Sequence, residues 1–371
     1  MKVFDLYRGG KAFAGLCSAK ARGKYIPWYL FLLVTEKCNM YCRYCYADIP
    51  ARLKNTERRV KEWTTGEIFK IIDDFYAIGT RYLNIQGGEP LLRDDLEEII
   101  DYANSKGMIT DMFTNGLLIH KKLKALRKLS RVTISLEGDE KTHDKDRGAG
   151  TYKRITENMQ LLYENDIKFS INYTVTSNNA DVNAIRHVLE LAKRYNSLVA
   201  VGEAVIKLDE SLSDRLVPTE RLRAFWEGVR RLKSEGYPLQ KSLKSIDSCI
   251  ETLDCVTGKD SYNEVDGLPY AKKIFPCAMG RYCAYLDTDG TLYPCANLFN
   301  KLGRNIFEVG AKKAWEDING HVKCRACRDS ITGGVNSFFA MDLDTIKEAA
   351  RHFWDFYVRR PKNRSGGASG N

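Results

Sequence analysis

Three cysteines near the start of the chain have the number and spacing to bind an iron–sulfur cluster. Cys38, Cys42 and Cys45 follow the pattern CxxxCxxC within residues 35–46. A structural zinc site or a closed 4Fe–4S cluster needs four ligands, so three thiolates leave one iron open to a small molecule. The ring of Tyr46, directly after the last cysteine, can shield such a cluster from water. The alternative is a zinc site that borrows a fourth cysteine, although zinc sites favour paired CxxC units.

A glycine-rich turn follows the next predicted strand. Gly87, Gly88, Glu89 and Pro90 form the sequence GGEP directly after the strand YLNIQ. Glycine lets the backbone approach a ligand closely, because it has no Cβ atom. Alone, GGEP is an ordinary turn, but its position one strand after the cysteines favours a shared site.

Together these two motifs resemble the radical S-adenosylmethionine (radical SAM) superfamily. The resemblance implies that the open iron binds the amino and carboxylate groups of SAM, and that Glu89 accepts a hydrogen bond from the SAM ammonium group. It also makes Ser135 a candidate for the ribose hydroxyls and Arg147 a candidate for bidentate binding of the SAM carboxylate. Asn172 and Val205, on later predicted strands, are candidates for ribose and adenine contacts.

A second group of cysteines lies in the C-terminal third. By resemblance to the auxiliary-cluster module called SPASM, Cys277, Gly290 and Cys295 match its opening half, and the pair Cys324 and Cys327 matches its middle. The later cysteines of a full SPASM module have no counterpart, which is similar to the shortened twitch domain. The resemblance therefore implies a second, fully liganded 4Fe–4S cluster suited to electron transfer, with zinc as the alternative occupant. Its ligands would be Cys277, Cys295, Cys324 and Cys327.

Three cysteines of this region stay outside that ligand set. Cys249, Cys255 and Cys283 could each replace a proposed ligand, pack inertly in the core, or donate a hydrogen atom to a substrate radical. A thiol donor in the site would indicate a redox-neutral reaction such as epimerisation, and its absence would favour net oxidation. No other side chain is assigned a catalytic role.

The elements that must position these residues alternate along the chain as strand and helix. Six apolar strands separated by amphipathic helices predict parallel βαβ crossovers, whose strand ends carry the cysteine and GGEP loops on one edge. The predicted fold class is α/β. The family resemblance implies a partial (β/α)6 TIM-type barrel, although periodicity alone does not separate it from an open doubly wound sheet. The predicted strands are 29–35, 82–86, 108–116, 131–138, 168–176 and 197–205, and the helices are 66–79, 94–106, 120–130, 151–166, 181–195 and 218–236.

The composition changes after these elements, and we divide the chain accordingly. A β-hairpin with an Asp-Gly turn is predicted over residues 282–295, within a small cysteine-rich twitch or SPASM-like domain. The predicted parts are an N-terminal arm (1–28), the barrel (29–240), the auxiliary-cluster domain (241–335), a C-terminal helix (336–358) and a disordered tail (359–371).

Composition and charge limit the class of protein. The longest apolar run, residues 29–34, is far short of the ~20 residues that span a bilayer, and we identify no signal peptide. We therefore expect a cytoplasmic protein whose eleven cysteines serve metal or redox chemistry rather than disulfides. The net charge of +10 fits solvated helix faces, an anionic substrate, or an acidic electron donor of the flavodoxin or ferredoxin type. Nucleic acid is not favoured, because no basic repeat carries interleaved aromatic residues.

The resemblance implies a radical SAM enzyme that cleaves SAM reductively and abstracts a substrate hydrogen. Its cofactors would be a SAM-binding 4Fe–4S cluster, SAM, and the second 4Fe–4S cluster. Because the N-terminal arm is too short for a peptide-recognition domain, we expect oxidation or epimerisation of a small molecule such as a sugar, cyclitol or lipid-linked intermediate. The alternatives are a maturase that modifies a peptide or protein, and a non-catalytic iron–sulfur or zinc-binding module.

Overall fold

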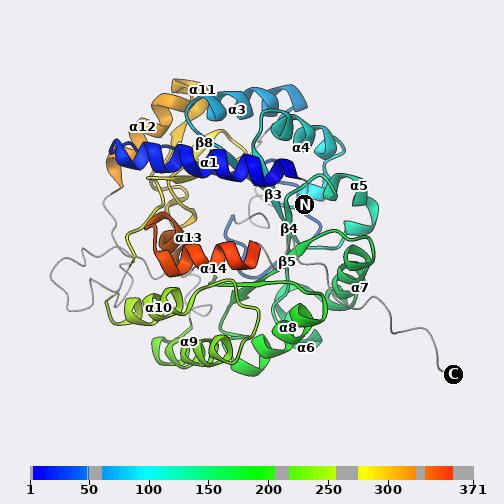
Figure 1. Cartoon of the computed structure of the whole chain (residues 1–371). Helices are drawn as coiled ribbons and strands as arrows, with labels where there is room; N and C mark the ends of the chain where they lie inside the picture. Colours follow the sequence, from blue (N-terminus) through cyan, green and yellow to red (C-terminus); the bar gives the residue numbers. More distant parts are fainter. Residues whose placement is uncertain are drawn as a thin grey trace.

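One curved sheet of nine strands forms the centre of the molecule (Figure 1). The computed structural model describes residues 3–47, 49, 61–204, 217–255, 275–322 and 331–353. The strand order is β6-β5-β4-β3-β2-β1-β7-β8-β9; β1 to β7 are parallel, and β8 and β9 run antiparallel to their neighbours. The strands are β1 (Tyr29–Leu33), β2 (Tyr82–Gln86), β3 (Ile109–Thr114), β4 (Arg131–Ser135), β5 (Phe169–Val175), β6 (Val199–Glu203), β7 (Cys283–Leu286), β8 (Thr291–Tyr293) and β9 (Arg304–Asn305).

Helices surround this sheet and connect its parallel strands (Figure 1). They are α1 (Val3–Ala21), α3 (Thr65–Ala77), α4 (Leu96–Ser105), α5 (Leu123–Leu126), α6 (Glu140–Arg147), α7 (Thr151–Glu164), α8 (Val182–Arg194), α9 (Thr219–Ser234), α10 (Leu243–Cys255), α11 (Ile306–Val309), α12 (Ala311–His321), α13 (Ile331–Phe339) and α14 (Leu343–Phe353). The predicted α/β fold, a partial (β/α)6 barrel, is confirmed: all six predicted barrel strands form, as β1 to β6. The predicted hairpin also forms, as β7 and β8.

Alternate residues of each strand enter two different layers of the core. In β1, Leu30 and Leu32 pack in the layer that the strands share with the surrounding helices. Phe31 and Leu33 belong to a second buried cluster together with Tyr285 of β7. This alternation follows from the two-residue period of a strand, and it turns every second side chain toward the inside of the barrel.

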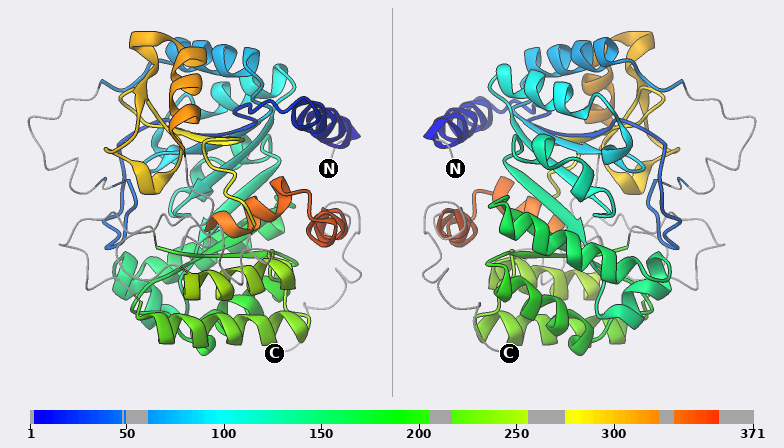
Figure 2. Two further views of the ribbon diagram at one scale, coloured as in Figure 1. Left: turned by 90° about the vertical axis from the view of Figure 1, so that its left-hand side faces the viewer. Right: turned by 90° about the vertical axis from the view of Figure 1, so that its right-hand side faces the viewer.

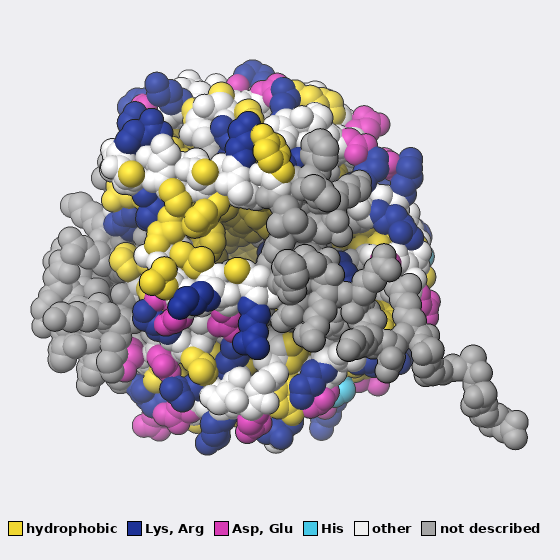
Figure 3. All heavy atoms as spheres, in the orientation of Figure 1, with side chains coloured by type: hydrophobic (Ala, Val, Ile, Leu, Met, Phe, Trp, Pro, Cys, Tyr) yellow, Lys and Arg dark blue, Asp and Glu magenta, His cyan; other side chains and the backbone are white. Residues whose placement is uncertain are grey.

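Helices α1 and α14 lie at the same end of the molecule (Figure 2). This is the end where the parallel strands begin, because Trp28 just before β1 donates its indole N–H to the carbonyl of Ala12 in α1 at 3.0 Å. The ring of Phe339 in α13 stacks on Tyr282, just before β7, with centroids 5.2 Å apart. On this face apolar side chains gather around a hollow (Figure 3). The loops at the carboxyl ends of the strands therefore lie at the opposite end.

Several segments differ from the expected division. The N-terminal arm contains a long helix, α1, and residues 120–130 form only the short α5 after a turn of 3-10 helix. Helix α5 ends early because the Asn104 side chain binds the carbonyl of Lys128 at 3.0 Å and Ser130 already pairs with β3. In place of one helix over 336–358, α13 and α14 are separated by a turn in which Met341 has a φ of +58°.

The sheet also continues across the boundary expected near residue 240. Strand β7 pairs with β1 in parallel, so the hairpin of the cysteine-rich region extends the barrel sheet. The tail over 359–371 lies outside the described residues. None of the helices in the described part of the chain combines the length and apolar composition that a membrane crossing requires.

Candidate functional site

A cavity of about 200 Å³ lies inside the barrel at the carboxyl ends of its strands. Its wall contains all three cysteines of the CxxxCxxC loop, both glycines and the proline of GGEP, and side chains from the ends of β3, β4 and β5. The main predicted motifs therefore meet in one place. The predicted site residues on this wall are Cys38, Cys42, Cys45, Gly87, Gly88, Pro90, Ser135, Arg147 and Asn172.

The three thiols of the cysteine loop are in surroundings that suit binding of an iron–sulfur cluster. Cys38, Cys42 and Cys45 are each partly buried. Burial raises the pKa of the Cys38 thiol to about 12, and it also raises the pKa of Cys42. Thiolates at such positions need nearby positive charge, which bound iron supplies. Among the described residues no three His, Cys, Asp or Glu side chains converge on a single ion, but the ligands of a cluster bind different irons and stand farther apart.

The GGEP turn lies directly against the backbone of the cysteine loop. The Gly88 N–H donates to the Thr35 carbonyl at 2.7 Å, and the Glu89 N–H donates to the Lys37 carbonyl at 2.8 Å. A Cβ atom on Gly88 would lie 2.2 Å from the Lys37 carbonyl oxygen, and one on Gly87 would lie 2.6 Å from that of Thr35. Only glycine permits this approach, so the residue types of the two motifs fit each other.

The Glu89 carboxylate is hydrogen-bonded to its own turn and to the end of β3. Its buried carboxylate accepts hydrogen bonds from the Leu91 N–H at 3.0 Å, the Thr114 hydroxyl at 2.8 Å and the Asn115 N–H at 2.8 Å. Burial raises the pKa of Glu89 to about 7, although the hydrogen bonds from these three donors act to lower it. The side chain braces the turn against β3 and is not part of the cavity wall, so this placement does not support its predicted contact with the SAM ammonium group.

The next two strands contribute a polar section of the wall. Ser135 at the end of β4 is paired in register with Asn172 of β5, and Thr174 lies two residues farther along β5. The Asn172 amide donates to the Thr174 hydroxyl at 3.0 Å. Val205 lies outside the described residues, but Ala204 just before it is part of the wall.

Arg147 lines the cavity, and the Glu137 carboxylate occupies the Nε and Nη2 edge of its guanidinium. The Arg147 Nε and Nη2 groups donate to the two carboxylate oxygens of Glu137 at 2.6 and 2.9 Å. Its Nη1 group lies 3.7 Å from the Cys42 sulfur, and Nε also contacts the Tyr44 hydroxyl at 2.8 Å. Burial alone would raise the pKa of Glu137, but Arg147 and His143 outweigh it and hold the pKa at about 2. This ion pair occupies the Nε and Nη2 edge of the guanidinium, so the predicted bidentate contact with a SAM carboxylate would use the Nη1 and Nη2 edge.

The C-terminal cysteines separate into different environments. Cys277 is buried and Cys295 half-buried, and both belong to the same buried cluster as Cys38 and Cys45. The other two proposed ligands of the second cluster, Cys324 and Cys327, lie outside the described residues.

Two of the three unassigned cysteines lie away from the cavity wall. Cys249 of α10 and Cys283 of β7 are buried, and neither is part of that wall. This placement does not support a hydrogen-donor role for either thiol. Cys255 is described only as the last residue of α10.

Sequence reasoning missed the aromatic side of the cavity. Phe31 of β1 and Tyr285 of β7 stack with their centroids 4.2 Å apart and an angle of 7° between the rings. Phe31 lies in the uniformly apolar run predicted as a buried strand, so its orientation toward the cavity had no signal in the sequence. Gln86, which also lines the cavity, was visible only as the polar residue that ends YLNIQ.

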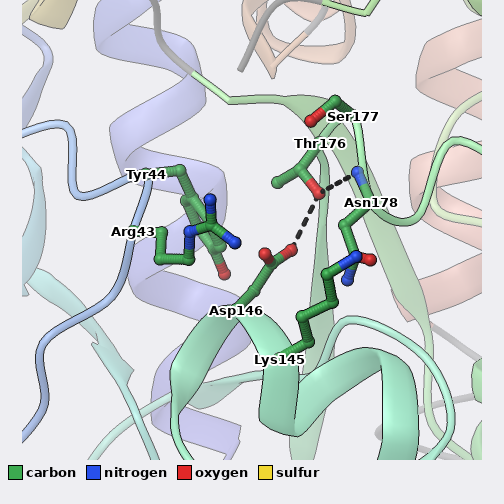
Figure 4. Close-up of a pocket in the computed structure, with 7 residues that line it drawn as sticks. All are labelled: Arg43, Tyr44, Lys145, Asp146, Thr176, Ser177 and Asn178. Atoms are coloured by element: carbon green, nitrogen blue, oxygen red, sulfur yellow. Dashed lines mark hydrogen bonds between the residues drawn. The ribbon is translucent and has the colours of Figure 1, made fainter. Parts of the chain in front are cut away.

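A second, smaller hollow of about 140 Å³ adjoins the cysteine loop (Figure 4). Tyr44 lines both hollows, and the exposed side chains of Arg43 and Lys145 lie at the smaller one. Its floor is polar: the Thr176 hydroxyl donates to the buried Asp146 carboxylate at 2.8 Å. Acidic and basic groups are mixed here, so charge alone does not identify a ligand.

Comparison with known proteins agrees with this geometry. Residues 32–192 match the family described as the Radical SAM superfamily. The chain is 33% identical over 217 residues to Fe-coproporphyrin III synthase of Methanosarcina barkeri, covering 56% of this chain and 53% of that protein. It is 27% identical over 309 residues to mycofactocin maturase MftC of Mycolicibacterium smegmatis, covering 80% and 71% respectively. The chain thus spans about half the length of the first curated relatives it matches.

The fold also resembles a solved structure. The structure of Streptococcus suis SuiB bound to precursor peptide SuiA matches with a TM-score of 0.62 and 18% identity, over 84% of this chain and 70% of that one. At this identity the likeness concerns the fold alone. The family match begins within β1 and ends within α8, so it contains the cysteine loop, the GGEP turn and the polar wall. Over residues 32–192 the chain is therefore similar to the radical SAM superfamily.

Proposed function

We propose that this chain is a radical SAM enzyme in which Cys38, Cys42 and Cys45 hold a 4Fe–4S cluster with one open iron. The observation that carries the proposal is the contact between the GGEP turn and the cysteine loop, which only glycine at position 88 permits. When bound, the reduced cluster and SAM supply a 5′-deoxyadenosyl radical that abstracts a hydrogen atom from the substrate.

The polar wall would hold the SAM molecule in place. Ser135, Asn172 and Thr174 offer hydroxyl and amide groups to the ribose, and the approach of the GGEP backbone leaves its own polar groups beside the cysteines. Glu89 contributes indirectly, because its three accepted hydrogen bonds hold the turn against β3. We propose Ala204 as part of the adenine side, since it lines the wall beyond Asn172.

Arg147 would act on the cluster ligands as well as on SAM. Its Nη1 group points to the Cys42 sulfur at 3.7 Å while Glu137 holds the rest of the guanidinium. A positive hydrogen-bond donor beside a ligating sulfur stabilises negative charge on it and tunes the reduction potential of a cluster. The Glu137 pair fixes this donor in one orientation.

The aromatic side of the cavity would receive the substrate. Phe31, Ile49 and Tyr285 are apolar lining groups, and they exclude water from the space beside the cysteines. Excluding water protects a reactive intermediate from side reactions.

We propose a small molecule as the substrate and hydrogen abstraction that leads to oxidation or epimerisation. A peptide substrate is the second candidate. It is favoured by the similarity to mycofactocin maturase MftC, which extends over 80% of this chain and therefore beyond the radical SAM match.

The second 4Fe–4S cluster is part of the same proposal. Cys277 and Cys295 flank the β7–β8 hairpin, and this hairpin pairs with β1, the strand that leads into the cysteine loop. Both cysteines share a buried cluster with Cys38 and Cys45, which favours electron transfer between the two sites. The electron donor would be an acidic protein of the flavodoxin or ferredoxin type.

The test is metal content and SAM cleavage in anaerobically reconstituted protein. We expect about eight irons per chain if both clusters form, an EPR signal that SAM perturbs, and release of 5′-deoxyadenosine after reduction. Cys42→Ala should abolish 5′-deoxyadenosine release, whereas Cys17→Ala, which changes a cysteine of α1, should preserve it. Sustained cleavage by Cys42→Ala would refute the proposed ligand set.

A further inference from the structure

The smaller hollow beside the cysteine loop has a buried acidic side chain at its centre (Figure 4). Asp146 is only 5% exposed, and its Oδ2 atom accepts a hydrogen bond from the Thr176 hydroxyl at 2.8 Å. Within the described part of the chain, no donor contacts the other carboxylate oxygen, Oδ1. Figure 4 shows this carboxylate directed into the hollow, between Arg43 and Asn178. A buried carboxylate oxygen is stabilised when a hydrogen-bond donor reaches it, so the hollow has a place for a donor group of a ligand.

Two basic side chains flank this acid without contacting it. Arg43 of the cysteine loop and Lys145 of α6 are exposed, and both line the hollow. Among the residues that the structure describes, neither charged group forms a hydrogen bond or an ion pair. The Arg43 backbone N–H donates to the Asp146 carbonyl at 3.2 Å, so the loop is held against α6. Both cations can therefore reach a ligand that binds at Asp146.

This mixture of charges disfavours the simplest ligands. A free anion would have to approach the buried Asp146 carboxylate, and like charges at short range repel each other. A metal ion or a simple amine would instead be repelled by Arg43 and Lys145. A zwitterion satisfies both kinds of group, because its ammonium donates to Asp146 while its carboxylate accepts from the two basic side chains.

The size of the hollow also fits a small zwitterion. Its volume of about 140 Å³ corresponds to roughly five water molecules at ~30 Å³ each. This is room for an α-amino acid with a short side chain, such as alanine. Ser177 and Asn178 add a hydroxyl and an amide to the wall, and both groups can bind polar atoms of such a ligand.

We propose that this hollow is a binding site for a small zwitterion of the α-amino acid class, in which Asp146 binds the ammonium group and Arg43 and Lys145 bind the carboxylate. The inference does not rest on the proposed function, because the site lies outside the main cavity. Tyr44 lines both spaces, and Thr176 directly follows β5. A bound ligand would therefore join the cysteine loop to α6 and to the end of β5.

The experiment compares three probes that differ by one charged group, on anaerobically reconstituted, SAM-loaded and unreduced protein. Alanine carries both charges, propionate lacks the ammonium group, and ethylammonium lacks the carboxylate. SAM, which the proposed function places in the main cavity, keeps an amino acid from binding there. Saturation-transfer NMR measures the dissociation constants. We expect alanine to bind at least ~10-fold more tightly than either single-charge probe, the order expected for one charged hydrogen bond.

Each side chain should affect a different pair of probes. Asp146→Asn keeps an acceptor for the Thr176 hydroxyl, but it should weaken alanine binding at least ~10-fold and strengthen propionate binding, because the repelling charge is gone. Arg43→Gln and Lys145→Gln should each weaken alanine and propionate binding only ~2- to 5-fold, since both groups are exposed, and neither should weaken ethylammonium binding. Lys141→Gln is the matched control, an exposed residue of the same helix that does not line the hollow, and should change none of the three constants.

Three results would overturn the inference. They are no alanine binding by wild type, equal affinity for alanine and either single-charge probe, or an alanine affinity that Asp146→Asn leaves unchanged. Circular dichroism identifies a variant that fails to fold, and the exposed Lys145→Gln then decides, because it should affect propionate and not ethylammonium. Release of 5′-deoxyadenosine from the same preparations tests the proposed function separately, since binding at this hollow does not depend on SAM cleavage.

Discussion

The two sides of the barrel interior differ in chemistry although one row of backbone pairs joins them. Tyr285 of β7 and Phe31 of β1 are neighbours in register, and the same row continues through Asn84 of β2 and Asp111 of β3 to Arg131 of β4. Two aromatic residues are thus followed by an amide and an ion pair at the same depth. The polar residues are hydrogen-bonded to one another and lie behind the cavity wall, while Phe31 and Tyr285 are part of that wall.

The difference also indicates where the fold tolerates change. An aromatic pair is stabilised by its buried area and its ring contact, which another apolar side chain partly replaces. A buried ion pair is different, since removal of one partner leaves an uncompensated charge. We therefore expect substitutions on the polar side to have larger effects than substitutions of similar size on the aromatic side.

The largest effect should come from the turn that seats the polar side against the cysteine loop. Gly88→Ala places a Cβ atom 2.2 Å from the Lys37 carbonyl oxygen, which forces the turn and the loop apart. We expect 5′-deoxyadenosine release to fall at least ~100-fold, because small misplacements of reacting groups have effects of this size. Gly66→Ala is the matched control, since nothing lies within 4 Å of the added atom. Equal activity of the two variants would show that the contact is dispensable.

Breaking the ion pair should have the next largest effect. Arg131→Met leaves the fully buried Asp111 without its guanidinium partner, and we expect ~3–5 kcal/mol loss in the free energy of unfolding. Urea denaturation of the two proteins measures this loss. Arg131→Lys, which keeps a positive charge, should recover part of it. A loss below ~1 kcal/mol would mean that the polar side is no more sensitive than the surface.

The aromatic side should respond more weakly. Phe31→Leu keeps an apolar group in the cavity wall but removes the ring stacked 4.2 Å from Tyr285. We expect ~1 kcal/mol of destabilisation, the usual value of an aromatic pair beyond its buried area. The same urea experiment measures it. A loss equal to that of Arg131→Met would remove the distinction between the two sides.

The smallest effect should be a pH dependence of stability that arises from the ion pair between Glu137 and Arg147. The pKa of Glu137 is about 2 in the folded protein, below its ordinary value of 4.5, because Arg147 and His143 outweigh the effect of burial. A lowered folded-state pKa gives stability that is fully present above the unfolded value and is lost as pH falls toward the folded one. Between pH 4.5 and 3, the free energy of unfolding should therefore fall more steeply in wild type than in Glu137→Gln. Parallel slopes would contradict the ion pair with Arg147.

The sequence predicted the elements well and the site in part. The cysteine loop was predicted from its spacing and GGEP from its position one strand later, whereas Ser135 and Asn172 were predicted by family resemblance, and the structure brings all of these onto one cavity wall. The contact of Glu89 with SAM stays a prediction, and its hydrogen bonds to Thr114 and Asn115 were not foreseen because no local pattern connects these residues. The contact of Arg147 with SAM also stays a prediction, and the pairing of its Nε and Nη2 groups with Glu137 was not foreseen from the sequence.

By itself the sequence determined the strand and helix order, the cysteine spacing and the Asp-Gly turn of the hairpin. These are local properties, set by side-chain periodicity and by the backbone freedom of a few residues. Only the tertiary structure decided that β7 extends the sheet beside β1 and that Phe31 turns into the cavity. It also decided that Asn84 and Gln86 connect Asp111 to Tyr46 through a row of hydrogen bonds. A strand buried on both faces carries apolar residues throughout, so its sequence does not show which face is inside. Contacts between distant segments then assign each polar group its partner.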